Sequence, residues 1–456
     1  MEEAERIASD GRPKADHLCV LIHGLWGNPK HMAYVASALR DKHAEDKLHI
    51  LIAKTNSDTY TYDGIDLGAE RVTHEIETCI SDLEKEGSHI SKLSIVGYSL
   101  GGLVARYAIG LLFSNGWFDR LEPVNFTTFA TPHLGVRAPV LGIHHRVWNV
   151  LGSQTLSASG RQLFTIDIFR NTNRPLLSIL ADPDSIFMLA LSRFKHRVLY
   201  ANIINDRSAP YYTTCIVTTD PYVNLDQINI NHLQGYAPVV LNPANPVSLK
   251  APDAQPPLMT RIAESSHALL SRVPLFAFLA VLIPIGSVVF LINSGVQTVR
   301  SQKRIRLHEE GKAGIGLGNY RIPLMVENAR TTMESAFANI NAGQRQQYLP
   351  PAKRTLSSKS SESDENQNGS IEKSPLPEPG HKHTSSSQSA EFPTLALTPE
   401  QFAMVKALDD LGFRKYRVHI QKVRHTHAAI IVRVQKKDFD EGEVVVRHWL
   451  EEEFEV

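Results

Sequence analysis

Short apolar runs alternate with longer segments of helical periodicity through the first half of this chain of 456 residues. The runs predict buried strands, and the longer segments predict amphipathic helices. Expected strands cover 17–24, 48–55, 92–99, 124–135 and 197–210, and expected helices between the first four of them cover 31–43, 66–86 and 100–113. Strands and helices in this order need crossover connections, so we expect an α/β fold with a mostly parallel central sheet and helices on both faces.

The composition of the sequence changes outside these segments. A helix-prone insertion at about 136–193 is expected to form a helical cap, and the stretch at 273–292 is apolar and carries no charge. Residues 344–392 are rich in Ser, Glu, Lys, Gln and Pro, a composition that cannot bury enough surface to order itself. The expected parts are a tail at 1–16, a core at 17–245, a linker with the apolar segment at 246–330, a largely disordered insertion at 331–396 and a C-terminal part of the core at 397–456.

The overall charge is balanced, because 48 Lys and Arg residues oppose 48 Asp and Glu residues. No net field therefore favours nucleic acid as a partner. The 3 cysteines are far apart and lack the spacing of a metal site, which indicates reduced thiols in a protein that faces the cytosol. The N-terminus is acidic and has no apolar core of a signal peptide, so we do not expect secretion.

The segment from Gly97 to Gly101 has the pattern G-x-S-x-G, with an expected strand before it and an expected helix after it. In a nucleophile elbow the serine lies on a strained turn, and its neighbours must lack a Cβ atom to avoid the adjacent strand and helix. This context predicts that Ser99 is a nucleophile. An ordinary strand-to-helix glycine turn is the structural alternative.

The segment LIHGLWGN, residues 21–28, follows the first expected strand. Acyl transfer needs two backbone N–H donors for the oxyanion, one after the nucleophile and one from an early strand-to-helix loop. The positions predict Leu100 and Leu25 as these donors. We expect Gly24 to let the backbone approach the substrate and His23 to brace the loop, although a plain glycine turn with a surface histidine would have the same sequence.

A serine nucleophile needs a base that a carboxylate orients, in the chain order Ser, Asp or Glu, His for this type of turn. Asp206 lies at the end of the apolar run in the expected strand segment 197–210, just before the turn RSAP, and is the preferred acid. Asp220 and Asp226 are its rivals, but neither ends so clear a strand. An Asp at a turn is often only a turn former, so the position alone leaves this role open.

The base should follow the last strand, and RHTHAAIIVRV lies there, after the expected strand YRVHIQKV. His427 is preferred because it directly precedes the apolar AAII segment that can anchor the loop. His425 is the alternative base. His133, in ATPHLG, precedes the acid in the sequence, so we expect it to shape the pocket.

At this point the chain resembles a known family. HLCVLIHGLWGN, IVGYSLGGLVARY, FATPHLGV, YANIINDRSAPYYT and RHTHAAIIVR together are similar to the fungal branch of the putative serine esterase, or lipase-like α/β-hydrolase, family. Its lipid-droplet phospholipases are the most similar, and the resemblance covers roughly 17–245 and 400–445. It implies an α/β-hydrolase fold, cleavage of acyl esters in glycerophospholipids or related lipids, and a triad of Ser99, Asp206 and His427. Ala209, where related chains tend to carry Val, concerns packing and not chemistry.

The apolar stretch 273–292 is long enough to cross a bilayer. The basic flank at 300–306 follows it, where its cations are expected to meet anionic lipid. These cations are Arg300, Lys303, Arg304 and Arg306.

A single crossing would place Ser99 and His427 on opposite sides of the membrane. Pro284 and Gly286 lie in the middle of the apolar stretch, where they can kink or reverse a helix. We therefore expect a hairpin that dips into a membrane or lipid-droplet monolayer. A helix pair packed on the protein's own core is the alternative.

These observations together predict a serine lipid hydrolase on the cytoplasmic side of a lipid droplet or an intracellular membrane. It would release fatty acids from glycerolipids through an acyl-enzyme, without a metal or organic cofactor. One alternative is a catalytically silent tether at a lipid surface. Another is a thioesterase or protein deacylase that uses the same triad.

Overall fold

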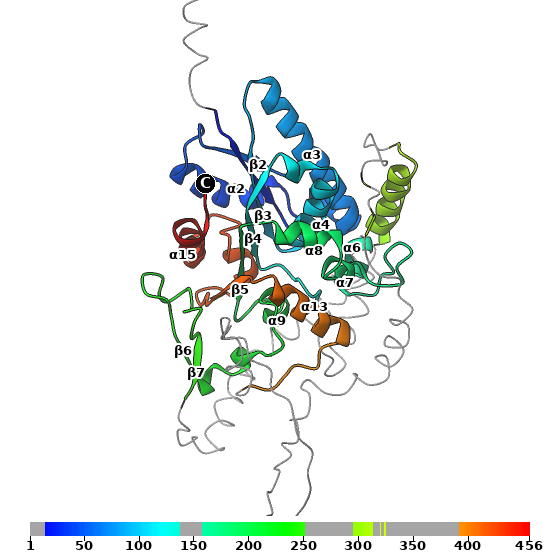
Figure 1. Cartoon of the computed structure of the whole chain (residues 1–456). Coiled ribbons are helices and arrows are strands. Elements are labelled where there is room, and N and C mark those ends of the chain that lie inside the picture. Colours follow the sequence, from blue (N-terminus) through cyan, green and yellow to red (C-terminus); the bar gives the residue numbers. More distant parts are fainter. Residues whose placement is uncertain (1–13, 137–156, 251–294, 313–319, 321–322, 325–391) are drawn as a thin grey trace, which may run out of the picture.

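The computed structural model describes residues 14–136, 157–250, 295–312, 320, 323–324 and 392–456 (Figure 1). The apolar stretch 273–292, most of the expected disordered insertion and residues 137–156 of the expected cap lie outside this part of the chain. In the described part no helix combines the length and hydropathy needed to cross a bilayer.

A parallel sheet of six strands, in the order β2-β1-β3-β4-β5-β8, forms the centre of the fold. The prediction of an α/β-hydrolase fold with a mostly parallel sheet is confirmed. The strands are β1 (His17–Ile22), β2 (Leu48–Ile52), β3 (Lys92–Tyr98), β4 (Glu122–Phe129), β5 (His196–Asn202) and β8 (Arg414–Val418). A separate antiparallel pair consists of β6 (Ile228–Ile230) and β7 (Val247–Leu249).

Helices cover both faces of the sheet, so the inner strands bury side chains on both sides (Figure 1). In β1, Leu18 and Val20 face one hydrophobic core, whereas Cys19 and Leu21 face the other, as the two-residue period of a strand requires. The first core lies under α3 (Ile65–Lys85), α4 (Leu100–Ser114) and α8 (Ile186–Ser192), and the second under α2 (Ala33–Lys42) and α15 (Asp440–His448).

The described part of the expected cap packs against α4. It comprises α6 (Ser157–Leu163), α7 (Leu176–Leu180) and α8. Gly110 of α4 lies against the ring of Phe187, where an added Cβ atom would be 2.3 Å from Cδ1 of that ring. Arg106 of α4 donates from Nη2 to the carbonyl oxygen of Leu180 over 2.8 Å. These helices therefore extend the core beside α4.

The C-terminal residues complete both the sheet and its cover. The last described segment begins at Phe392. In this segment Thr394 forms a bridge with Thr219, and α13 (Pro399–Asp410) begins with a capping box at Thr398. Further short elements are α9 (Tyr211–Thr214), α14 (Thr426–Ala429), a π-helix (Trp449–Glu453) and the 3₁₀ helices η1 (Pro29–Met32), η2 (Asp58–Tyr62), η3 (Trp117–Asp119), η4 (Pro221–Val223), η5 (Leu225–Gln227) and η7 (Lys437–Phe439). A helix over 295–309 lies beside the core.

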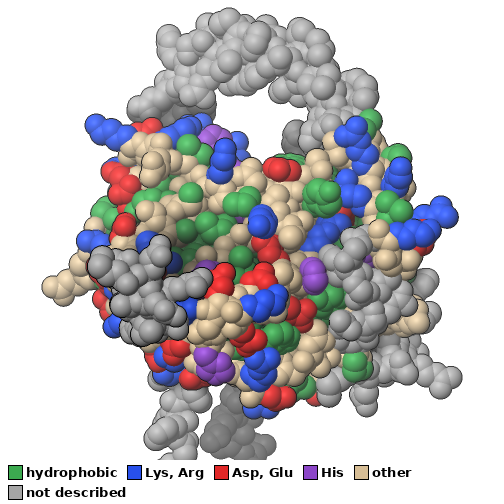
Figure 2. Space-filling view, turned by 90° about the horizontal axis from the view of Figure 1, so that it is seen from above, with side chains coloured by type: hydrophobic (Ala, Val, Ile, Leu, Met, Phe, Trp, Pro, Cys, Tyr) green, Lys and Arg blue, Asp and Glu red, His purple; other side chains and the backbone are tan. Residues whose placement is uncertain are grey.

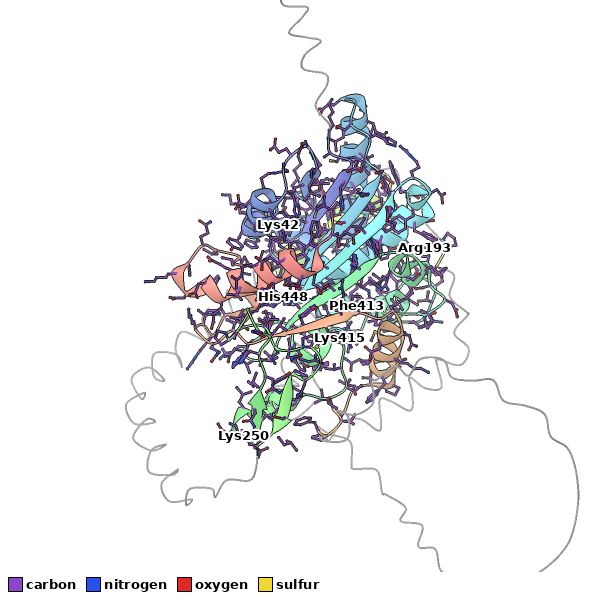
Figure 3. All side chains as sticks on the ribbon, turned by 60° about the vertical axis from the view of Figure 1, so that its left-hand side comes forward. Lys42, Arg193, Lys250, Phe413, Lys415 and His448 are labelled. Carbon is purple, nitrogen blue, oxygen red and sulfur yellow. The ribbon has the colours of Figure 1, made fainter. Side chains whose placement is uncertain are left out.

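Tyrosine and histidine side chains join α15 to the sheet. Nδ1 of His448, labelled in Figure 3, lies 2.7 Å from the hydroxyl of Tyr200 in β5, and its ring centroid is 4.5 Å from that of Tyr416 in β8. The C-terminal segment thus fixes the end of the sheet that carries β8.

The cysteines are free thiols, and charges of both signs are mixed on one face of the molecule (Figure 2). Cys19 and Cys215 are buried, Cys79 is half-buried, and none of the three forms a disulfide. On the face seen in Figure 2, acidic and basic side chains are interspersed.

Candidate active site

Ser99 lies between β3 and α4 in a backbone conformation that residues with a side chain rarely adopt. Its φ is 56° and its ψ is −127°. A Cβ atom on Gly97 would lie 2.4 Å from the Cα atom of Gly102, and one on Gly101 would lie 2.2 Å from the carbonyl oxygen of Ile22. The turn therefore needs glycine on both sides of the serine, which is the steric requirement of a nucleophile elbow.

The structure brings Ser99, His427 and Asp206 together from three separate loops. Nε2 of His427 lies 2.9 Å from Oγ of Ser99, and its Nδ1 lies 2.8 Å from Oδ2 of Asp206. The three loops follow β3, β5 and β8, whose carboxyl ends share one edge of the parallel sheet. This geometry allows the imidazole to take the serine proton while the carboxylate fixes the tautomer and the ring orientation.

Further donors hold the Asp206 carboxylate in place. Oδ1 accepts from the backbone N–H groups of Ser208 and Ala209, over 3.0 and 2.9 Å. Oδ2 also accepts from the side-chain amide of Asn202 over 3.0 Å. Ala209 contributes only its backbone N–H to the carboxylate, so its side chain does not affect this contact.

His427 is held through its own backbone and its neighbours. Its carbonyl oxygen accepts from the hydroxyl of Tyr98 over 2.9 Å, and burial raises the pKa of this tyrosine, which keeps the donating proton on the phenol. Thr426 donates from Oγ1 to the carbonyl oxygen of Ile204 over 3.0 Å, which ties the base loop to the acid loop. His425, the alternative base, lies exposed at the start of α14.

Residues 23–28, which we name the oxyanion loop after their expected role, lie directly beside Ser99. A Cβ atom on Gly24 would be 2.7 Å from Cβ and 3.2 Å from Oγ of Ser99. The carbonyl oxygen of Gly24 accepts from the N–H of Gly27 over 3.0 Å and from Nδ1 of His23 over 3.1 Å. Because the peptide is planar, these bonds also fix the direction of the Leu25 N–H.

The second expected donor, the N–H of Leu100, belongs to the first residue of α4. The first N–H groups of a helix have no partner within the helix and carry its positive dipole end, so they suit an oxyanion. His23 braces the oxyanion loop, since its Nε2 lies 3.1 Å from Oγ of Ser57, and burial lowers its pKa.

The other expected candidates lie apart from this chain of contacts. Nε2 of His133 lies 3.1 Å from Oγ1 of Thr128, and the residue is fully buried. Asp220 caps η4 by accepting from the N–H of Tyr222 over 3.0 Å, and Asp226 is exposed in η5.

Two parts of the arrangement were not predicted from the sequence. Asn202 and Tyr98 support the triad, and only their places at the ends of β5 and β3 could have indicated them.

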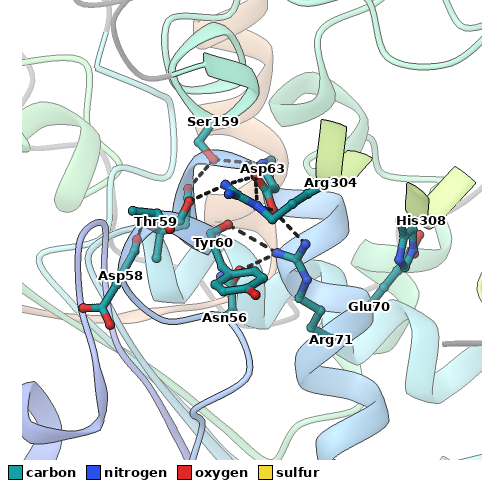
Figure 4. A network of polar contacts seen from close by, with 12 residues as sticks. Asn56, Asp58, Thr59, Tyr60, Asp63, Glu70, Arg71, Ser159, Arg304 and His308 are labelled. Atoms are coloured by element: carbon teal, nitrogen blue, oxygen red, sulfur yellow. Dashed lines mark hydrogen bonds and ion pairs between the residues drawn. The ribbon is translucent and has the colours of Figure 1, made fainter. Parts of the chain in front are cut away.

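The expectation that Arg304 meets lipid is wrong, because its side chain turns inward and forms an ion pair with Asp63 at 2.7 Å (Figure 4). Arg300, Lys303 and Arg306 of the same basic flank are exposed.

Residues 12–219 match a known family, described as putative serine esterase (DUF676). Over these residues the chain resembles that family. The matched residues include Ser99, the segment 23–28 and Asp206, whereas His427 lies beyond them. The expected resemblance is confirmed at the level of the serine esterase family, and the narrower resemblance to lipid-droplet phospholipases stays a prediction.

Curated relatives from two yeasts are named lipases. The chain is 30% identical over 213 residues to Putative lipase C4A8.10 of Schizosaccharomyces pombe, which covers 44% of this chain and 26% of that protein. It is 29% identical over 241 residues to Putative lipase ROG1 of Saccharomyces cerevisiae, which covers 52% of this chain and 34% of that protein. The match thus spans about a quarter to a third of the length of these relatives.

Solved structures with some similarity are more distant. Phospholipase PlaB from Legionella pneumophila is 14% identical, with 42% of this chain and 39% of that chain covered and a TM-score of 0.26. An alpha/beta hydrolase fold protein from Nakamurella multipartita is 10% identical, with 44% and 79% covered and a TM-score of 0.23.

Proposed function

We propose that this protein is a serine hydrolase that releases fatty acids from glycerolipids, with phospholipids as the first substrates to test. The observation that carries the proposal is the hydrogen-bonded chain from Ser99 through His427 to Asp206, on a turn with the steric demands of a nucleophile elbow. The yeast relatives that are named lipases support an ester substrate of lipid origin.

The mechanism follows from the positions of these side chains. His427 removes the proton from Ser99 as its oxygen attacks the ester carbonyl, and Asp206 stabilises the resulting imidazolium. The N–H groups of Leu25 and Leu100 are placed to bind the oxyanion. His427 then gives the proton to the leaving alcohol, and an acyl-enzyme forms on Ser99. Water activated by His427 releases the fatty acid, so these groups complete the cycle without a cofactor.

The test compares the wild type with Ser99→Ala on mixed phospholipid and triacylglycerol emulsions. Free fatty acid release by the wild type should be lost in the variant, while binding to the emulsion persists. The emulsion that the wild type prefers would define the lipid class. Binding without release by either protein would favour the tether or the thioesterase, and thioester substrates would then separate these two.

We also propose that the protein works on a membrane or lipid-droplet surface that the stretch 273–292 enters as a hairpin. The contact of Ser99 with His427 supports a hairpin over a span, because both residues must lie on the same side of the lipid. The helix over 295–309 supports the same placement, since Val296 and Val299 are 45% and 67% exposed beside the exposed cations Arg300 and Lys303.

Flotation with anionic phosphatidylserine vesicles tests this placement. The wild type should float with the vesicles, and a variant with Phe276→Asp and Leu282→Asp should stay in the dense fraction. Fractionation of cells should find the wild type on droplets or intracellular membranes, accessible to protease from the cytoplasmic side. Flotation of the double variant at the wild-type level would exclude the apolar stretch as the lipid contact.

A further inference from the structure

The oxyanion loop rests on a neighbouring segment, residues 57–63, which we name the brace segment. The N–H of Trp26 donates to Oγ1 of Thr61 over 3.0 Å, and the N–H of Asp58 donates to the carbonyl oxygen of Gly27 over 2.7 Å. These bonds hold the oxyanion loop on both sides of the Trp26 backbone. The position of the brace segment therefore sets where the oxyanion loop lies relative to Ser99.

The oxyanion loop is also under backbone strain. Trp26 has a φ of 55°, which is unfavourable for a residue with a large side chain. A strained conformation of this kind persists only when the surrounding contacts impose it. Because Leu25 directly precedes Trp26, the contacts that impose the strain also fix the peptide next to the expected oxyanion donor.

Two arginines anchor the brace segment around the buried carboxylate of Asp63 (Figure 4). Arg71 of α3 donates to Oδ2 of Asp63 over 2.7 Å and to the carbonyl oxygen of Tyr60 over 3.3 Å. Arg304 donates from Nη2 to Oδ1 of Asp63 over 2.7 Å and to the carbonyl oxygen of Thr59 over 2.8 Å. Both guanidinium groups also lie over the Tyr60 ring, at 4.9 and 5.0 Å.

Arg304 reaches this site from a helix that is distant in the sequence. The helix over 295–309 turns an unusual polar face to the core: Gln297, Ser301 and His308 are buried there, and Arg304 is largely covered. Nε2 of His308 lies 2.5 Å from Oε2 of Glu70 in α3. The helix therefore binds the core through specific polar contacts, and one of its residues holds the brace segment directly.

We propose that Arg304 is a positioning residue for acyl transfer. It holds the brace segment, the brace segment holds the oxyanion loop, and the oxyanion loop presents the N–H of Leu25 to the transition state. This inference rests on the proposed esterase function. It also links turnover at Ser99 to the docking of the helix over 295–309, which directly follows the stretch proposed to enter lipid.

The test measures kcat and KM of the full chain on 4-nitrophenyl butyrate, a soluble ester that needs no lipid surface. The rates are divided by the number of sites that a fluorophosphonate labels at its end point, so that unfolded protein does not count. For Arg304→Met, kcat per site should fall about 10- to 100-fold while KM changes less than about 2-fold, because a small misplacement of a transition-state donor acts on kcat. Arg304→Lys keeps the charge but not the bidentate contact, so its kcat per site should fall about 3- to 10-fold.

The matched control is Arg306→Met, which removes an exposed arginine of the same helix that contacts Glu310. This control should keep the wild-type kcat per site. Equal rates per site for Arg304→Met and Arg306→Met would overturn the inference, and so would a wild-type rate for Arg304→Lys if Arg304→Met does not fold. A wild type without turnover that depends on Ser99 would instead refute the proposed function, and this inference with it.

Discussion

The loops after β4 and β8 each place a histidine near the same edge of the sheet, but they give the two residues different chemistry. Among the residues that the structure describes, Nε2 of His133 has only the hydroxyl of Thr128 as a hydrogen-bond partner, and its buried Nδ1 has none. His427 has Asp206 on one nitrogen and Ser99 on the other, and its side chain is 14% exposed. A carboxylate partner and access to substrate therefore distinguish the base from the structural histidine.

Electrostatics separates the two loops as well. Burial lowers the pKa of His133 well below its usual value, and the nearby guanidinium of Arg106 lowers it further. Arg106 donates to the carbonyl oxygens of Leu180 and His133, over 2.8 and 3.4 Å. His133 therefore stays neutral and serves the packing around α4, whereas the carboxylate beside His427 can stabilise a positive charge that forms during the reaction.

The largest expected effect comes from exchanging the two histidines for an uncharged amide. His427→Gln removes the base, so kcat for ester hydrolysis should fall by about 10⁵- to 10⁶-fold, the loss typical of a missing triad histidine. His133→Gln keeps a donor near Thr128 and should leave kcat within about 3-fold, as for residues outside the reacting groups. Steady-state rates on 4-nitrophenyl butyrate measure both. A comparable loss of kcat in the two variants would show that His427 and His133 do not differ in their roles.

The second effect concerns Asp206, because His427 has this carboxylate as a partner and His133 has no such partner among the described residues. Asp206→Asn should lower kcat by about 10⁴-fold, because an amide favours the wrong tautomer of His427. Asp226→Asn is the matched control, since Asp226 is an exposed residue of η5 and should leave the rate unchanged. The same assay applies. A larger loss in Asp226→Asn than in Asp206→Asn would show that Asp206 is not the acid that orients His427.

The contacts of Ser99 and His427 could be predicted from the sequence because a local signal marks each of their loops. The strands at 17–24 and 92–99 are apolar on both faces, and the structure buries them between two cores. His427 was preferred over His425 because apolar residues follow it directly. In α14 Ala428 and Ala429 are buried, which fixes the orientation of this short helix, while His425 remains in solvent.

The contacts of Arg304 could not be predicted in the same way. Its partner Asp63 lies 241 residues earlier, and no local pattern encodes such a pairing. The surrounding basic residues indicated a solvated or lipid-facing segment, which Arg300 and Lys303 fit. The helix buries Gln297, Ser301 and His308, so hydrophobic periodicity does not show which face is buried.

The third effect probes the oxyanion loop. In Gly24→Ala the new methyl group would lie 2.7 Å from Cβ of Ser99, so the oxyanion loop or the nucleophile must shift. We expect kcat to fall by about 10²-fold, the scale of a misplaced reacting group. Gly295→Ala is the control, because its added Cβ atom meets no atom of the described residues within 4 Å. Unchanged turnover in Gly24→Ala would show that the oxyanion loop adapts without loss.

The smallest expected effect is on stability and its pH dependence, and it sharpens the difference in charge between the two histidines. Between its lowered pKa in the folded state and about 6.5 in the unfolded chain, His133 binds a proton only after unfolding. The free energy of unfolding therefore falls as the pH drops through this range, by up to about 1.4 kcal/mol per pH unit for one histidine.

His133→Gln removes this proton uptake. Between pH 6.5 and 5 the wild type should lose up to about 1.7 kcal/mol more than the variant, as measured by urea unfolding at several pH values. Burial also lowers the pKa values of His17 and His448 to about 4, but these residues contribute equally to both proteins and cancel in the difference. Parallel stability curves would mean that His133 takes up its proton in the folded protein. The conclusion that burial keeps His133 neutral would then fail.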